Sequence, residues 1–156
     1  MVGALGFSAG GHLTATLAVH WDHYLCEVDD LTVNISARPD AVVLCYPVID
    51  MDQHRHRGSF NNLMGPVADE KLVDALSCQK QVRSDSPPAF LWHTADDGAV
   101  PVQNSLLYFS ACREKQVRAE LHVYESGHHG MGLADKHETI RSWTTLACEF
   151  LKRHLS

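Results

Sequence analysis

Residues 2–12 read VGALGFSAGGH, and this segment predicts a strand, a sharp turn and a helix in immediate succession. The apolar run at residues 2–5 is typical of a buried strand. It leads into residues 6–10, GFSAG, which match the G-x-S-x-G pattern of a nucleophile elbow, a turn that raises a serine above the end of a sheet. The apolar Leu13 and Leu17 then fit the inward face of a helix that starts directly after the turn.

The residue types in this turn suit a nucleophile. Strained backbone angles at Ser8 would leave no room for bulky neighbours, which explains the flanking glycines. The hydroxyl of Ser8 would stand clear of the sheet, and the backbone N–H of Ala9, at the start of the helix, would point at a developing oxyanion. A glycine-rich turn with an idle serine would give the same pattern, so the motif needs support from the rest of the chain.

The composition indicates one ordinary domain with its own core. Of the 156 residues, 45% are hydrophobic, and no low-complexity tract suggests disorder. The net charge is −6 without a basic stripe, which argues against nucleic acid and anionic membranes as partners. No apolar run approaches the ~18 residues of a membrane span. The five cysteines are scattered without a C-x-x-C pair, which is typical of reduced thiols and leads us to expect a cytoplasmic protein.

The rest of the chain alternates strands and helices. Further strands are predicted at residues 41–46, 89–94 and 119–124, and helices at about residues 10–19, 68–76, 101–115 and 135–154. Residues 51–66 are polar and are interpreted as a loop or lid, and Leu106, Leu107 and Phe109 are expected on the buried side of their helix. The order βαβαβαβα predicts an α/β fold, a parallel sheet with helices on both faces.

Side chains of complementary chemistry follow three of these strands. Ser8 follows the first, the pair Asp96-Asp97 the third, and the pair His128-His129 the last. Functional sites of such sheets lie beyond the carboxyl ends of the strands. Acyl transfer by serine needs a hydroxyl, an imidazole that takes its proton and an acid that holds the imidazole in the right tautomer. The chain order therefore predicts a Ser-Asp-His triad, in which either aspartate and either histidine fit.

At these motifs the sequence resembles the bacterial acetylxylan/feruloyl-type carbohydrate esterases of the α/β-hydrolase superfamily. The likeness lies in GFSAGGHL at residues 6–13, PPAFLWHTADD at 87–97, VPV at 100–102 and ESGHHG at 125–130. It implies esterases that remove acyl groups, often acetyl, from sugars. The D-x-x-V-P pattern of that family falls on Asp97, and its base directly precedes a glycine. The resemblance thus implies Asp97 as the acid and His129 as the base, with Asp96 as a loop cap and His128 lining the site.

The same resemblance implies elements that this sequence lacks. These are strands before the elbow and a His-Gly-Gly-Gly-type loop that would supply a second oxyanion donor. We therefore expect residues 1–156 to form a single α/β-hydrolase domain without its N-terminal strands, in which Ala9 supplies the oxyanion donor. The strand before Ser8 would keep a free edge, which predicts self-association into a homo-oligomer or marginal stability.

Together these features predict a serine carboxylesterase that hydrolyses acyl esters, acetyl esters of carbohydrates above all. Ser8, Asp97 and His129 would act through an acyl-enzyme, without a cofactor, on a small-molecule or carbohydrate ester. Two alternatives stay open because the specificity of such a site depends on its loops. One is another α/β-hydrolase, a formamidase or a small peptidase, and the other is an inactive hydrolase fragment.

The remaining conspicuous residues receive structural interpretations. His54 and His56 lack the further ligands that a metal site needs, so they are assigned to a solvated loop and no metal is expected. His12 is expected to support the fold through a hydrogen bond. His93 ends a strand and is interpreted as a core residue. Tyr46 and its neighbour Pro47 are candidates for a wall of the acyl pocket.

Overall fold

A computed structural model describes residues 1–22, 36–65 and 69–156. Four parallel strands form one sheet in the order β1-β2-β3-β4. The strands are β1 Gly3–Phe7, β2 Ala41–Cys45, β3 Ala89–Thr94 and β4 Ala119–Tyr124. This arrangement confirms the predicted α/β fold, and the last two strands have the predicted bounds.

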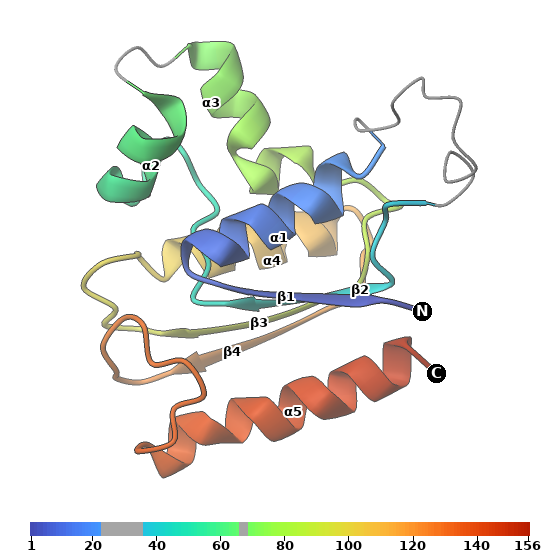
Figure 1. Cartoon of the computed structure of the whole chain (residues 1–156), viewed down its shortest axis with the longest axis vertical. Helices are drawn as coiled ribbons and strands as arrows, with labels where there is room; N and C mark the ends of the chain where they lie inside the picture. Colours follow the sequence, from blue (N-terminus) through green and yellow to red (C-terminus); the bar gives the residue numbers. More distant parts are fainter. Residues whose placement is uncertain (23–35, 66–68) are drawn as a thin grey trace.

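Helices cover both faces of the sheet (Figure 1). They are α1 Ala9–His20, α2 Arg57–Met64, α3 Glu70–Leu76, α4 Gln103–Glu114 and α5 Glu138–His154. Among the helices of the described residues, α5 alone packs on one face, through Ile140, Trp143, Ala147 and Phe150, which recur at helical spacing and are buried. Helices α1 and α4 pack on the other face. Among the described residues, no helix is both long and apolar enough to cross a bilayer.

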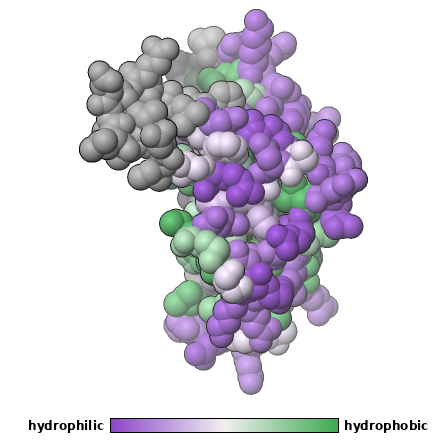
Figure 2. Space-filling model, turned by 90° about the vertical axis from the view of Figure 1, so that its right-hand side faces the viewer, coloured by the Kyte–Doolittle hydropathy of each residue, from purple (hydrophilic) through white to green (hydrophobic). Residues whose placement is uncertain are grey.

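The two inner strands differ from the two outer ones in burial. Every residue of β2 and of β3 is buried, as expected for parallel strands covered on both faces. In the outer strands Leu5 of β1 is 48% exposed and Val123 of β4 is 44% exposed. Hydrophilic residues predominate on the surface seen in Figure 2, with apolar residues in small scattered groups. In the described sheet β1 pairs only with β2, and self-association across its free side stays a prediction.

The interpretation of residues 51–66 as a loop is wrong, because α2 lies within this segment. Gly and Asn residues make it a poor helix former by sequence. Two contacts outweigh this weakness. The imidazole of His56 accepts a hydrogen bond from the Ser59 N–H, 3.2 Å away, and so caps the helix. Phe60 and Met64 pack on a small apolar cluster that contains Val48 and Val100.

The predicted orientation of α4 is also wrong, since its buried face carries Asn104, Ser105, Tyr108 and Cys112, whereas Leu106 is 45% exposed. Asn104 and Ser105 are buried because their polar groups have partners. The Asn104 Oδ1 accepts hydrogen bonds from the backbone N–H groups of Ile49 and Asp50 at 2.8 and 2.9 Å. The helix therefore fixes the chain that follows β2.

Candidate active site

The turn between β1 and α1 holds Ser8 in a backbone conformation that L residues rarely adopt, with φ 53° and ψ −118°. Such a residue costs about 1–3 kcal/mol of strain. Close packing around the turn maintains this backbone conformation. A Cβ on Gly6 would lie 2.1 Å from the Gly10 carbonyl oxygen, and one on Gly11 would lie 2.7 Å from the Pro47 Cβ. The expected crowding at Gly10 itself is not observed, because nothing lies within 4 Å of its Cβ position.

Three side chains that are distant in sequence form a chain of hydrogen bonds at the carboxyl ends of β1, β3 and β4. The Ser8 Oγ lies 2.7 Å from the His129 Nε2, and the His129 Nδ1 lies 2.6 Å from the Asp97 Oδ2. Because a carboxylate only accepts, the Nδ1 donates to it, which leaves the Nε2 free to accept the serine proton. The structure therefore brings together the three residues that the chain order and the resemblance single out.

The carboxylate of Asp97 is fixed in position by its own loop. Its Oδ1 accepts hydrogen bonds from the N–H groups of Ala99 and Val100, both at 2.9 Å, and its side chain has no exposed surface. Burial raises the pKa of Asp97, but the hydrogen bonds from His129, Val100 and Ala99 outweigh it, and the pKa lies below its ordinary value. Asp97 is thus ionised at neutral pH, and its Oδ2 accepts the hydrogen bond from the imidazole.

The neighbours Asp96 and His128 have different contacts. The Asp96 Oδ1 accepts a hydrogen bond from the Gly127 N–H at 2.7 Å, which ties the acid loop to the histidine loop, as a capping carboxylate would. The His128 Nδ1 donates to the His129 carbonyl at 2.8 Å. Neither side chain takes the place of Asp97 or His129 in the hydrogen-bonded chain to Ser8.

The interpretation of His93 as a core residue left out its contact with Asp97. Its Nε2 donates to the Val100 carbonyl at 2.9 Å and also lies 3.4 Å from the Asp97 Oδ2. Its Nδ1 accepts from the Ser105 hydroxyl at 2.8 Å. Burial lowers the pKa of His93, more than its hydrogen bond to Val100 and the charge of Asp97 raise it, so the ring is neutral. Its position four residues before Asp97 was the available signal in the sequence.

Tyr46 also positions the site, at a point directly after β2. Its ring meets the His129 ring edge-on, with centroids 4.9 Å apart, and its hydroxyl accepts a hydrogen bond from the Gly132 N–H at 2.9 Å. The contact between the two rings limits how far the imidazole can tilt. Tyr46 has φ 36°, so the aromatic side chain is held there against a backbone cost.

The backbone N–H of Ala9 is available as a donor, because the first N–H groups of a helix have no acceptor inside it. This N–H belongs to the residue that follows Ser8, and it lies at the positive end of the α1 dipole. In residues 1–22, 36–65 and 69–156, no group of three or more His, Cys, Asp or Glu side chains could hold a metal ion. The site as described is therefore suited to acyl transfer by a serine.

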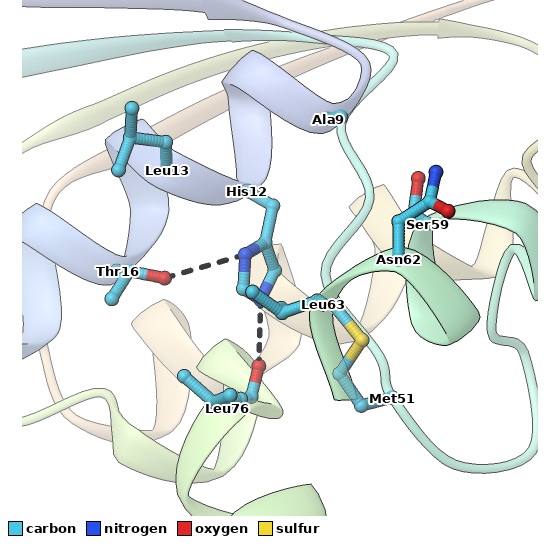
Figure 3. A pocket seen from close by; sticks show the side chains of 9 residues that line it. All are labelled: Ala9, His12, Leu13, Thr16, Met51, Ser59, Asn62, Leu63 and Leu76. Carbon is cyan, nitrogen blue, oxygen red and sulfur yellow. Dashed lines mark hydrogen bonds between the residues drawn. The ribbon is translucent and has the colours of Figure 1, made fainter. Parts of the chain in front are cut away.

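Two hollows lie beside this turn. The first has a volume of about 420 Å³, is lined by residues from the turn, α1, α2 and the end of α3, and includes Ala9 (Figure 3). The second, about 480 Å³, is a shallow, open hollow that includes Asp96, Ser126, His128 and His129. Ala9 belongs only to the first lining and His129 only to the second, so the two hollows border different parts of the site.

Comparison with known proteins gives one family model and two curated relatives. Residues 1–111 match the family model described as BD-FAE. The chain is 38% identical over 143 residues to endo-1,4-beta-xylanase B of Butyrivibrio fibrisolvens, covering 90% of this chain and 22% of that protein. It is 38% identical over 136 residues to the acetylxylan esterase of Xylanibacter ruminicola, covering 84% and 26%. The chain thus spans about a quarter of these curated relatives.

Solved structures include near matches to the whole described fold. An acetyl ester-xyloside bifunctional hydrolase from Caldicellulosiruptor lactoaceticus superposes with a TM-score of 0.92 at 44% identity, covering 97% of this chain and 56% of that one. The carboxylesterase Cest-2923 from Lactobacillus plantarum gives 0.76 at 28% identity, covering 97% and 57%. An α/β-hydrolase enzyme from a deep-sea metagenome gives 0.67 at 28% identity, covering 98% and 54%. The fold is that of the α/β-hydrolases.

Proposed function

Because the chain belongs to the BD-FAE family, we propose that it is a serine carboxylesterase that removes acyl groups, acetyl among them, from esterified carbohydrates. One observation carries the proposal: the unbroken hydrogen-bonded chain from the Ser8 Oγ through the His129 imidazole to the Asp97 carboxylate, with distances of 2.7 and 2.6 Å. An acylating serine needs this arrangement, whereas an idle serine in a glycine turn does not.

The chemistry follows from the atoms that meet at this site. As the Ser8 Oγ attacks the ester carbonyl, the His129 Nε2 takes its proton, and the charge of Asp97 stabilises the imidazolium that forms. The Ala9 N–H donates to the oxyanion. His129 then gives its proton to the departing alcohol, and the acyl group stays on Ser8. A water molecule, deprotonated by the same imidazole, releases the acid and restores the serine.

The carbohydrate part of the proposal rests on the relatives and on polar side chains near His129. An acetylxylan esterase and an acetyl ester-xyloside hydrolase are among the similar proteins, at 38% and 44% identity. The open hollow beside His129 includes the Asp96 carboxylate and the side chains of Ser126 and His128. These groups offer hydrogen-bond partners to sugar hydroxyls on the side where the alcohol departs.

The test is labelling followed by a substrate panel. We expect a fluorophosphonate probe to label this chain, Ser8→Ala to abolish the label, and Ser110→Ala, a change at an exposed serine of α4, to leave it intact. Acetylated xylan and p-nitrophenyl acetate should then be hydrolysed faster than aryl amides. Preference for the amides would favour the formamidase or peptidase alternative. A folded chain whose Ser8 takes no label would be an inactive hydrolase fragment.

A further inference from the structure

The geometry of ester attack determines where each part of the substrate lies around Ser8. The leaving oxygen has to lie close to the His129 Nε2, because that atom returns the proton to it. The carbonyl oxygen has to face the Ala9 N–H. The third substituent on the reacting carbon, the chain of the acyl group, is therefore directed away from His129. A binding site for the acyl chain is therefore expected next to the serine turn, on the side away from His129.

The hollow of about 420 Å³ fits this requirement, since it is lined by Ala9 and not by His129. Figure 3 shows side chains from α1, α2 and the end of α3 around it. Its apolar members are Ala9, Leu13, Met51, Leu63 and Leu76. Leu13 is 72% exposed and Leu63 is 49% exposed, although both are large apolar side chains. An apolar group bound between them would remove this surface from water.

The polar residues of the same wall do not call for a charged ligand. The His12 Nε2 donates to the Leu76 carbonyl at 2.8 Å, and its Nδ1 lies 3.5 Å from the Thr16 Oγ1, so both ring nitrogens face partners in the protein. Burial lowers the pKa of His12, which keeps the ring neutral. The other polar lining residues, Ser59 and Asn62, are uncharged. The hollow as a whole therefore suits an uncharged, mainly apolar group.

We propose that this hollow is the acyl-binding site and that it accepts aliphatic acyl groups longer than acetyl, with Leu13 and Leu63 as the residues that set the limit. The inference rests on the proposed esterase function. In the step concerned, the bond from the Ser8 Oγ to the acyl carbon forms, the bond to the alcohol oxygen breaks, and the proton passes through His129 to that oxygen. The volume lies in the range of roughly 300–1,000 Å³ that is typical of sites for whole small molecules. An acetyl group would fill only a small share of it.

The experiment measures acylation of Ser8 in the full chain with p-nitrophenyl acetate, butanoate and octanoate. Release of p-nitrophenol gives the rate, and the intact mass identifies the acyl adduct. We expect butanoate and octanoate to acylate Ser8 at least as fast as acetate. Leu63→Trp, which fills the hollow from α2, should lower the octanoate rate about tenfold relative to the acetate rate. Leu106→Trp, the same change at an exposed leucine of α4, should leave the ratio unchanged.

Leu13→Trp is the second variant, because it narrows the hollow from α1 at a largely exposed position where folding is tolerant. The same loss of octanoate selectivity is expected. An octanoate-to-acetate ratio that stays within twofold of the parent in both tryptophan variants overturns the acyl site while leaving the esterase function intact. Failure of all three esters to acylate Ser8 in the folded chain overturns the function and the acyl site together.

Discussion

The imidazoles of His129 and His93 both approach the Oδ2 of Asp97, yet only one is placed to move a proton. The His129 Nδ1 lies 2.6 Å from that oxygen and the His93 Nε2 lies 3.4 Å from it. The side chain of His129 is 21% exposed, whereas that of His93 has no exposed surface. Nearness to the acid is therefore shared by the two rings. What differs is that the second nitrogen of His129 faces the Ser8 hydroxyl.

The two rings also differ in which groups their nitrogens contact. Both nitrogens of His93 are engaged inside the protein, one with the Val100 carbonyl and one with the Ser105 hydroxyl. Protonation would force the Ser105 hydroxyl to turn and would bury a charge, which is why burial lowers the pKa of His93. We infer that His129 acts on the substrate and that His93 acts only through Asp97. Four substitutions or conditions test this division, in order of decreasing effect.

The largest effect is expected from His129→Ala. Without the base, kcat for p-nitrophenyl acetate should fall by about 10⁶-fold, as for the loss of a triad member in a well-studied serine protease. Circular dichroism should show an unchanged fold, because His129 is partly exposed. A loss of only tenfold would mean that another group, with His93 the nearest imidazole to Asp97, takes the proton.

Asp97→Asn should have the next largest effect. An amide would favour the wrong tautomer of His129, and kcat should drop by about 10⁴-fold with little change in KM. The matched control is Asp96→Asn, whose amide oxygen still accepts the hydrogen bond from the Gly127 N–H. With p-nitrophenyl acetate, a substrate that has no sugar to contact Asp96, the control is expected to retain activity within about twofold of the parent. Equal losses in the two variants would contradict the assignment of Asp97 as the acid.

Substitution of His93 should act through Asp97 and so be milder. His93→Phe removes the partners of Val100 and Ser105, and small displacements of the acid of this kind cost up to about 10²-fold in rate. His93→Gln, which keeps a donor for the Val100 carbonyl, should recover much of kcat, with KM unchanged in both variants. If the two variants lose stability but keep the parent kcat, His93 is a core residue without a positioning role.

The smallest effect is a pH dependence of stability. The native pKa of His93 is lowered below its ordinary value of 6.5, so the unfolded chain takes up a proton that the folded chain does not. The free energy of unfolding should therefore be largest above pH 6.5 and should decrease as the pH falls from 6.5 toward the lowered native pKa. His12 contributes in the same direction.

Urea unfolding between pH 7.5 and 5 measures this slope above the range in which Asp97 titrates. His93→Gln should make the slope shallower, and His12→Gln serves as the matched comparison at the other buried imidazole. A slope that His93→Gln leaves unaltered would indicate that folding does not lower the pKa of His93, contrary to the division between the two histidines.

Local patterns in the sequence predicted the strands and the meeting of Ser8, Asp97 and His129. Residues 89–94 form a strand as expected because their apolar run is too continuous for a half-exposed segment. The triad could be narrowed to Ser8 and two pairs of residues because each follows a strand, and parallel strands end at one edge. The choice of Asp97 over Asp96 and of His129 over His128 came from the family resemblance.

The features that escaped prediction depend on contacts between distant residues. Helix α2 forms in a segment of weak helix formers because Phe60 and Met64 find an apolar cluster supplied by other loops. The role of His93 depends on Val100 and Ser105, which reach it only once α4 has packed against β3. The leucines of α4 were predicted on its buried side because nothing local reveals that Asn104 binds the backbone after β2.

The backbone of Ser8 has one consequence for how this protein can change. A residue with φ 53° and ψ −118° is strained for every amino acid that has a Cβ, and glycine alone relieves that strain. Ser8→Gly should thus melt at a higher temperature than Ser8→Ala. Directed evolution that rewarded heat tolerance alone would drift toward glycine at this position. Such an experiment has to select for catalytic activity in the same round, or it will yield a protein that is more stable but inactive.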